Sequence, residues 1–171
     1  MRMVAIDAAE VPVSEGPDPM ERLEALYRSE HQGAVHLALL LTGDHAVAQE
    51  LAQEAFVRVA PRLDQTDNPG GYLRTTLVNL CRDHGRRQAT VRRHPDAPPA
   101  VAPAPDLPAD VGEVWLAVQA LPEHQREVLV LRYWTDLRTE EIARLLGVPH
   151  PTVRSRIRRG LASLQEVLTD A

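Results

Sequence analysis

The chain of 171 residues has few of the groups that build covalent, metal or aromatic sites. Its one cysteine, Cys81, excludes an internal disulfide and leaves no paired-cysteine spacing for zinc. Aromatic residues make up only 4% of the chain, and all 19 basic residues are arginine, because lysine is absent. We therefore expect no metal and no cofactor, and we expect Cys81 to be a small buried side chain.

Long apolar runs are also absent from the sequence. No stretch reaches the roughly 18 consecutive apolar residues that indicate a membrane span. The N-terminus has no charged segment followed by an apolar core, which would direct export. The sequence thus predicts no membrane insertion and a cytoplasmic protein.

Charge is unevenly distributed along the chain, which carries −5 in total. Residues 1–63 and 95–147 each carry −5, whereas residues 64–94 carry +3 and residues 148–171 carry +2. Guanidinium groups suit phosphates and guanine edges, so the two basic segments are candidate DNA contacts. The acidic N-terminal segment would repel DNA and suits a basic protein partner.

Proline divides the chain into two parts. Residues 95–110, PDAPPAVAPAPDLPAD, hold six prolines and almost no large apolar side chain, which predicts an extended flexible linker. Residues 1–17 are expected to be disordered. This leaves two small domains, at residues 18–94 and 111–171, and apolar residues recur at helical spacing in both, so the predicted fold class is all-α.

The first domain begins with two predicted helices. Asp18, followed by proline and by Glu21 at the third helical position, matches a capping box and predicts a helix that runs to about Leu41 and ends at Gly43. Asp44 can cap the second helix, which Pro61 should end or kink. Its residues at four-residue spacing predict a buried stripe: Val47, Leu51, Ala55 and Val59.

The third predicted helix, opened by Asn68 and Pro69, has two contrasting faces. Asparagine and arginine at helical spacing can hydrogen-bond bases and phosphates, although a solvated helix surface would look the same. A residue placement of 100° per step puts Leu73, Leu77, Leu80, Cys81 and His84 on an apolar face, and Thr75, Asn79, Arg82 and Arg86 opposite.

Four more helices are predicted in the second domain, near residues 111–120, 122–135, 139–146 and 151–166. The last two form a helix-turn-helix pattern, with Thr139 as a cap, Gly147 ending one helix and Pro151 opening the next.

The final helix separates an apolar from a basic side. The predicted inward stripe is Val153, Ile157, Leu161 and Leu164, while Ser155, Arg158 and Arg159 face outward with Arg154 and Arg156 on the flanks. Such an outward basic surface fits the major groove of DNA.

Two blocks of sequence resemble a known family. LPEHQREVLVLRYWTDLRTEEIARLLGVPHPTVRSRIRRGLASL resembles region 4 of the extracytoplasmic-function sigma factors of bacterial RNA polymerase. LLTGDHAVAQELAQEAFVRVAPRL, followed by GGYLRTTLVNLCRDHGRR, is similar to their region 2. The resemblance implies a region 2-like bundle of three to four helices and a region 4-like domain of four helices, joined by the Pro/Ala-rich linker.

The resemblance also implies roles for particular residues of the first domain. It places binding to the clamp helices of the largest polymerase subunit on the outer side of the second helix, at Glu50, Gln53 and Glu54. It places recognition and opening of the minus-ten element on the loop of residues 64–71 and the third helix. The residues that match are Tyr72, Asn79, Arg82, Arg86 and Arg87.

For the second domain, the resemblance implies binding to the flap of the second-largest polymerase subunit and recognition of the minus-thirty-five element. The residues that match the DNA-contact positions are Arg132, Thr152, Arg154, Ser155, Arg158 and Arg159. Most relatives are held inactive by an anti-sigma factor, which makes such a protein a further possible partner.

Two other interpretations fit parts of the sequence. A stand-alone helix-turn-helix regulator would need a ligand-binding or dimerising first domain, yet no Gly-rich phosphate loop or dimerising heptad run is present. A site-specific recombinase would need a catalytic domain on a mixed sheet, yet residues 18–90 indicate helices only. The sequence therefore predicts a non-enzymatic sigma factor.

Overall fold

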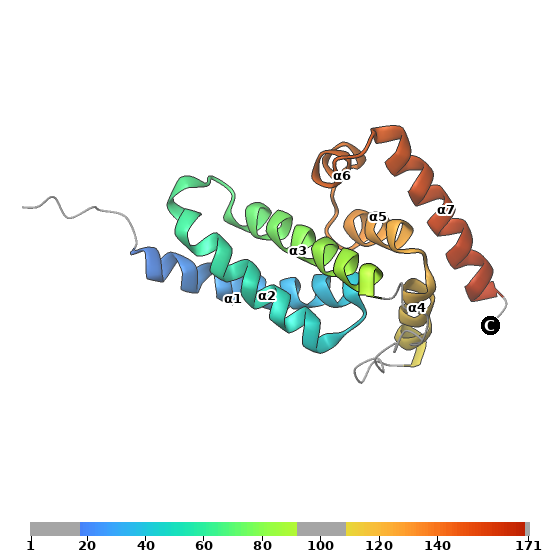
Figure 1. Ribbon diagram of the computed structural model, residues 1–171, viewed down its shortest axis with the longest axis horizontal. Helices are drawn as coiled ribbons and strands as arrows, with labels where there is room; N and C mark the ends of the chain where they lie inside the picture. The colour runs from blue at the N-terminus through green and yellow to red at the C-terminus, as the bar shows by residue number, and fades with distance from the viewer. Residues whose placement is uncertain (1–17, 92–108, 170–171) are drawn as a thin grey trace, which may run out of the picture.

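The computed structural model describes residues 18–91 and 109–169, and every regular element within them is a helix (Figure 1). The predicted all-α fold class is confirmed. An N-terminal domain contains α1 to α3, and a C-terminal domain contains α4 to α7. The bounds are α1 Pro19–Thr42, α2 His45–Val59, the 3-10 helix η1 Ala60–Gln65, α3 Pro69–Val91, α4 Ala109–Ala120, α5 Glu123–Tyr133, α6 Thr139–Leu146 and α7 His150–Thr169.

The junction of α1 and α2 follows its local signals. Gly43 takes a left-handed conformation with φ of 75°, and its N–H donates to the Leu39 carbonyl at 2.8 Å. The Asp44 carboxylate then accepts from the Val47 N–H at 3.1 Å and caps α2. At the start of α1, Asp18 occupies the cap position without a side-chain cap bond, so the predicted capping box there is wrong.

The core of the N-terminal domain lies between α1, α2 and α3. The predicted stripe of α2 is buried except at Val47, which lies in the first turn of the helix and is half-buried. The four apolar residues predicted on α3, from Leu73 to Cys81, are buried as well, whereas His84 is half-buried. The polar face of α3 is therefore turned away from this core.

In the C-terminal domain, α5 packs against α6 and α7. The predicted Thr139 cap is wrong: Arg138 precedes the helix, and its N–H donates to the Glu141 carboxylate at 2.7 Å. Glu141 can reach back to that N–H from the third helical position, so it satisfies an otherwise unpaired donor. Thr139 becomes the first residue of α6.

The inward side of α7 differs from the predicted stripe at one position. Val153 is buried and Ile157 and Leu164 are half-buried, but Leu161 is 42% exposed and Gly160 is buried in its place. A helix turns 100° per residue, so the residue seven positions after Val153 returns to the same side, and the residue eight positions after it does not. Gly160 lies where α7 passes close to Leu129 of α5.

The two domains lie against each other, with α5 beside α1 and α3 (Figure 1). The Gln119 side chain donates to the Leu40 carbonyl at 3.1 Å, and Arg82 meets Glu127. Helix α4 begins at Ala109, so the predicted linker of residues 95–110 ends two residues too late. The rest of that prediction, and the prediction that residues 1–17 are disordered, concern segments outside the described residues.

Candidate DNA and polymerase interfaces

The predicted helix-turn-helix is present in α6 and α7. Gly147 has a left-handed φ of 65°, and the Val148 N–H donates to the Ala143 carbonyl at 3.1 Å, which closes the end of α6. At the start of α7, His150 Nε2 lies 2.8 Å from Thr139 Oγ1. These contacts tie the first turns of both helices together and fix the angle at which α7 is presented.

The outer side of α7 carries the arginines expected to contact the minus-thirty-five element. Arg154, Arg158 and Arg159 are exposed, whereas Arg156 is half-buried and its charge acts on the Glu127 carboxyl, whose pKa is raised mainly by burial. Two surface hollows border the helix. One is lined by His150, Pro151, Arg154, Ser155 and Arg158, and the other by His124, Pro151, Thr152, Ser155, Arg156 and Arg159.

Arg132, the remaining residue predicted for the minus-thirty-five element, lies apart from this group on α5. Its guanidinium donates to the Leu137 carbonyl at 3.0 Å and lies 3.9 Å from the Asp136 carboxylate. Through these two contacts Arg132 stabilises the turn before α6, in which Asp136 has a left-handed φ of 54°. A DNA contact by Arg132 stays a prediction.

The residues predicted to contact the minus-ten element lie along α3. Asn79, Arg86 and Arg87 are exposed, and Arg86 forms an ion pair with Asp83 of the same helix. The half-buried Tyr72 lies at the start of α3. Arg82 differs from the others because its charge is engaged by the C-terminal domain.

The segment before α3 is held by contacts that sequence reasoning missed. The Arg62 guanidinium donates to the Tyr72 hydroxyl at 3.0 Å, and Arg22 pairs with Asp64 at 2.5 Å. Asn68 Oδ1 also accepts from the Gly71 N–H at 2.8 Å. The contacts of Arg62 and Arg22 form through tertiary packing, so they had no local sequence signal. The Asn68 contact is local, and the sequence had already marked Asn68 as the start of the third helix.

The outer side of α2 carries the residues predicted to bind polymerase. Glu50, Gln53 and Glu54 are all exposed. The Glu54 carboxylate also accepts from Arg58 one turn later at 2.5 Å, a surface pair of small energetic value. The three side chains thus share one solvent-facing side of the helix, as their spacing predicted.

Glu127 of α5 is a charged residue that the sequence did not single out. It is 8% exposed, and Arg82 Nε lies 3.0 Å from its Oε1, but the N–H does not point at the oxygen well enough for a hydrogen bond. Burial raises the pKa of the Glu127 carboxyl, and the positive charge of Arg82 offsets part of that rise. Burial also raises the pKa of Cys81 to about 12, with a smaller contribution from Glu127.

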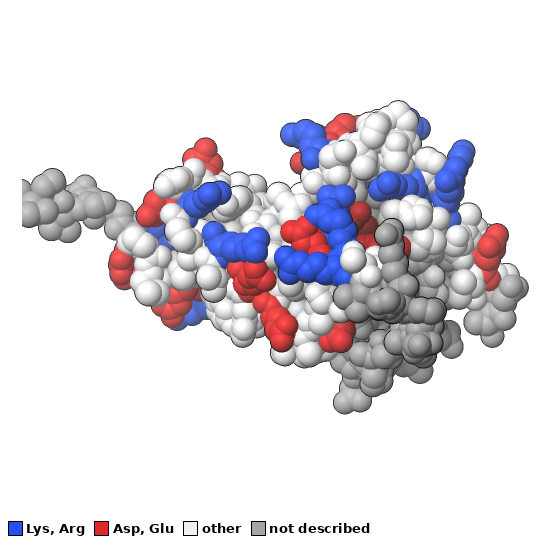
Figure 2. All heavy atoms as spheres, in the orientation of Figure 1, with Lys and Arg blue, Asp and Glu red and all other residues white. Residues whose placement is uncertain are grey.

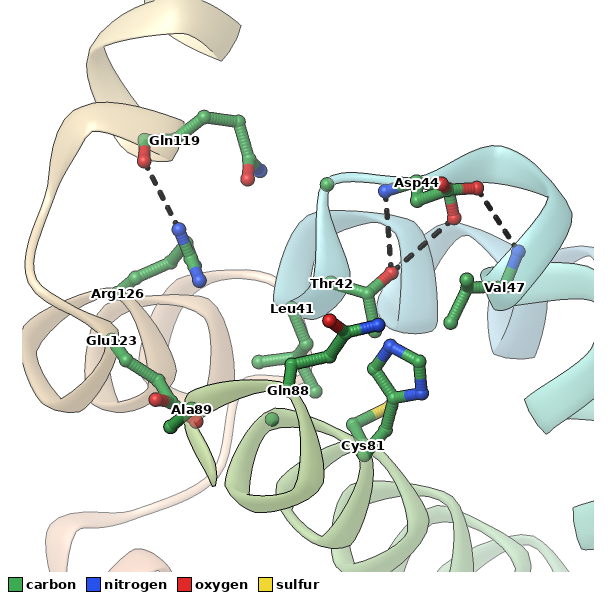
Figure 3. Close-up of a pocket in the computed structure, with 13 residues that line it drawn as sticks. Leu41, Thr42, Asp44, Val47, Cys81, Gln88, Ala89, Gln119, Glu123 and Arg126 are labelled. Atoms are coloured by element: carbon green, nitrogen blue, oxygen red, sulfur yellow. Dashed lines mark hydrogen bonds between the residues drawn. The ribbon is translucent and has the colours of Figure 1, made fainter. Parts of the chain in front are cut away.

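A cavity of about 580 Å³ opens where the two domains meet (Figure 3). The end of α1 and the start of α2 form one wall, α3 forms another, and α4 and α5 form the third. The Arg126 guanidinium donates to the Gln119 carbonyl at 3.0 Å at this third wall. The labelled residues that line the cavity are Leu41, Thr42, Asp44, Val47, Cys81, Gln88, Ala89, Gln119, Glu123 and Arg126.

Within residues 18–91 and 109–169, no group of three or more His, Cys, Asp or Glu side chains is placed to hold a metal ion. Over the same residues, no helix has the length and apolar character needed to cross a membrane.

The two halves of the chain match two family models. Residues 26–91 match Sigma-70 region 2, and residues 112–164 match Sigma-70, region 4. The first match covers α2 and α3 with most of α1, and the second covers the helix-turn-helix. Both candidate DNA faces therefore lie in the matched segments.

Curated relatives and solved structures agree with these matches. The chain is 32% identical to the RNA polymerase sigma-E factor of Streptomyces avermitilis, over 85% of this chain and 84% of the relative. It is 34% identical to a probable RNA polymerase sigma factor of Xanthomonas campestris, over 77% of this chain but only 36% of that relative's length.

The fold is similar to the sigma factor in a co-crystal structure with the anti-sigma factor NepR from Bartonella quintana. The TM-score is 0.72 at 22% identity, with 87% of this chain and 98% of that chain covered. A further relative, the ECF RNA polymerase sigma factor SigE of Mycolicibacterium smegmatis, is 35% identical over 87% of this chain and 62% of its own length. The chain belongs to the sigma-70 family, in the extracytoplasmic-function group of RNA polymerase sigma factors.

Proposed function

We propose that this sigma factor binds core RNA polymerase and directs it to promoters through two separate DNA faces. The outer side of α7 reads the minus-thirty-five element, and α3 with the segment before it recognises and opens the minus-ten element. The observation that carries this proposal is the pair of outward basic helix faces, one in each matched region, on an otherwise acidic chain.

The presentation of α7 supports a role in reading bases. The contacts between α6 and α7 hold the N-terminal half of α7 free on its outer side, as a recognition helix requires. Arg154, Arg158 and Arg159 can extend from this side to guanine edges or phosphates. Arg156 is half-buried and close to Glu127, so it contributes a phosphate contact at most.

Opening of the minus-ten element depends on polar contacts in this chain. Unstacking a base costs a few kcal/mol, which a protein offsets by capturing the extruded base. Tyr72 is the aromatic residue near the proposed site, and its hydroxyl accepts from Arg62, which limits how the ring can turn. Hydrogen bonds from Asn79 and the arginines of α3 therefore supply most of the capture.

The protein partners follow from the surfaces that are left. The exposed side of α2 bearing Glu50, Gln53 and Glu54 binds the clamp helices of the largest polymerase subunit, and the C-terminal domain binds the flap of the second-largest subunit. We propose an anti-sigma factor as a third partner, because the Bartonella quintana sigma factor of similar fold was solved in complex with the anti-sigma factor NepR.

Transcription in vitro from a random promoter library, with purified core polymerase, tests this function directly. We expect initiation at a defined set of sequences only when both the chain and core polymerase are present. Specific, nanomolar binding of duplex promoter by the free chain at near-physiological salt would contradict the proposal and indicate a stand-alone regulator.

The minus-thirty-five face has a matched test within α7. Replacing Arg159 with alanine should weaken use of that element by about 1–3 kcal/mol, with the loss depending on the promoter sequence. The control is Arg156→Ala, in which a smaller and sequence-independent loss is expected. Equal losses for both variants on every promoter tested would show that the base-reading face is assigned wrongly.

A further inference from the structure

His124 stands at the start of α5, beside the helix that the proposed function places in the major groove. It is the second residue of α5, which begins at Glu123, and its side chain is exposed. The next residue, Gln125, packs against α7, because a Cβ added at Gly160 would lie 3.4 Å from the Gln125 Cβ. The packing of α5 on α7 therefore fixes the position of His124 relative to the recognition helix.

One of the two surface hollows beside α7 opens between this histidine and the helix. The hollow is lined by His124 from α5 and by five residues from α7: Pro151, Thr152, Ser155, Arg156 and Arg159. Figure 2 shows arginine side chains along the outer edge of the molecule where Figure 1 places α7. The hollow thus joins an imidazole to two hydroxyl groups and to the guanidinium that we expect to read a base.

The hollow on the other side of α7 also contains a histidine, but that ring is already engaged. His150 is half-buried, and its Nε2 lies 2.8 Å from Thr139 Oγ1 and 3.2 Å from the Glu140 carboxylate. These contacts join α6 to α7, so His150 stabilises the helix-turn-helix itself. His124 is the exposed one of the two histidines and can turn toward a ligand.

We propose that His124 is a further contact of the minus-thirty-five element, in which its imidazole donates a hydrogen bond to a backbone phosphate beside the groove that α7 enters. A recognition helix contacts base edges, whereas a neighbouring helix meets the backbone at the rim of the groove. An imidazole has an N–H donor in both protonation states, and the charged ring is also attracted to the phosphate. This inference rests on the proposed role of α7 in reading DNA.

The charge of the ring makes this contact recognisable in an experiment. A neighbouring phosphate favours the protonated imidazole, so DNA binding should take up a proton at His124. On α7, the charged groups beside it are Arg156 and Arg159, which line the same hollow. On α5, the adjacent Glu123 places its carboxylate against Gly85 of α3. Substitution of His124 leaves these groups in place, so the difference between variant and wild type isolates the ring.

Promoter binding by the holoenzyme, formed from core polymerase and the full chain, tests the contact. The DNA is a fluorescent promoter fragment selected in the transcription experiment, and fluorescence anisotropy measures its affinity. We expect His124→Ala to weaken binding more at about pH 6 than at about pH 8, because histidine is charged at the lower pH and neutral at the higher. At the lower pH this loss should shrink about 3.5-fold between about 50 and 200 mM salt, since one phosphate contact contributes a salt slope of about 0.9.

Two further variants serve as matched controls. His124→Arg keeps a cation at this position at every pH, so it should bind more tightly than His124→Ala by the same factor at both pH values. His45→Ala removes an exposed histidine at the start of α2 and should bind like wild type. A loss for His124→Ala that is absent or equal at both pH values, or a matching loss for His45→Ala, would overturn the phosphate contact.

A promoter fragment that lacks the minus-thirty-five segment locates the contact. On this DNA the difference between wild type and His124→Ala should disappear, and a difference that persists would overturn the assignment to that element. Base changes within the element should leave the loss for His124→Ala unchanged, because a phosphate carries no sequence information, and a loss that varies with the bases would contradict the proposal.

The two proposals fail in different ways. A holoenzyme that selects no promoter from the library would refute the proposed function and this contact with it. A selected promoter that wild type and His124→Ala bind equally would refute the contact alone.

Discussion

Gly160 offers a sharp test of how the recognition helix is held. A Cβ added at this position would lie 2.8 Å from Leu129 Cδ1, closer than real Cβ contacts come, and 3.2 Å from Leu129 Cγ, which is a tight contact. Alanine favours a helix interior by about 0.8–1 kcal/mol over glycine. Overpacking a buried site costs about 1–3 kcal/mol, so we expect Gly160→Ala to lower the free energy of unfolding by about 1 kcal/mol.

The same substitution at Gly33 provides the control. Gly33 lies within α1, is exposed, and has no heavy atom within 4 Å of an added Cβ. Gly33→Ala should therefore stabilise the protein by about 0.5–1 kcal/mol through helix propensity alone. Urea unfolding followed by far-ultraviolet circular dichroism measures both changes, and equal stabilisation by both variants would refute the close packing of α7 on α5.

The contact itself can be isolated with a double-mutant cycle. Leu129→Val shortens the side chain that the new Cβ would meet, at a cost of its own of about 1 kcal/mol. In that background Gly160→Ala should lose most of its penalty, which gives a coupling of about 1 kcal/mol between the two sites. Additive effects would mean that Leu129 does not limit the approach of the helices.

Two further predictions concern α3 and α5. Asn79→Ala should spare core-polymerase binding and impair promoter opening, because Asn79 is exposed opposite the buried side of α3; permanganate footprinting should show a defect on duplex DNA that pre-melted DNA relieves, and lost core binding would indicate a folding role instead. A carboxyl with a raised pKa in the folded state contributes stability below its unfolded pKa that is lost as the pH rises through the folded value. Glu127→Gln should therefore gain stability over wild type as the pH rises above about 4.5, by at most about 1.4 kcal/mol per pH unit. Urea unfolding across this pH range measures the difference, and a difference that is constant with pH would contradict it.

Sequence reasoning succeeded where the physical cause is local. The glycine and aspartate at residues 43 and 44 predicted the end of α1 and the start of α2, and the structure has the left-handed residue and the cap in those places. Gly147 likewise marked the turn of the helix-turn-helix. Each signal depends on a few neighbouring residues, so no tertiary contact could override it.

The predictions were wrong where the sequence allows more than one helix cap, or where packing between helices determines which residues are buried. Thr139 is a good cap by residue type, but the Glu141 carboxylate accepts from the Arg138 N–H, and the cap position is Arg138. Leu161 was predicted to be buried, yet the close approach of α5 selects Gly160 for that side of α7. A glycine in a helix interior is itself unfavourable, and that was an available signal of close packing.

The pairing of Arg82 with Glu127 had no sequence signal, because the two residues meet only through the packing of the two domains. A proline-rich connection was expected to leave the domain spacing undefined, whereas α5 lies against α1 and α3. Both observations are compatible, since closing a loop of n residues costs entropy only as about (3/2)RT ln n. Tethering also gives each domain a high effective concentration of the other, so contacts too weak to join separate molecules can hold within one chain.

We expect the free chain to bind promoter DNA weakly. Each basic face offers only a few phosphate contacts, so either domain alone should gain little affinity from counterion release. If the clamp helices of core polymerase grip one domain and the flap grips the other, core polymerase fixes the distance between the two DNA faces. Two weak contacts would then act as one strong contact, because the second binding event becomes intramolecular.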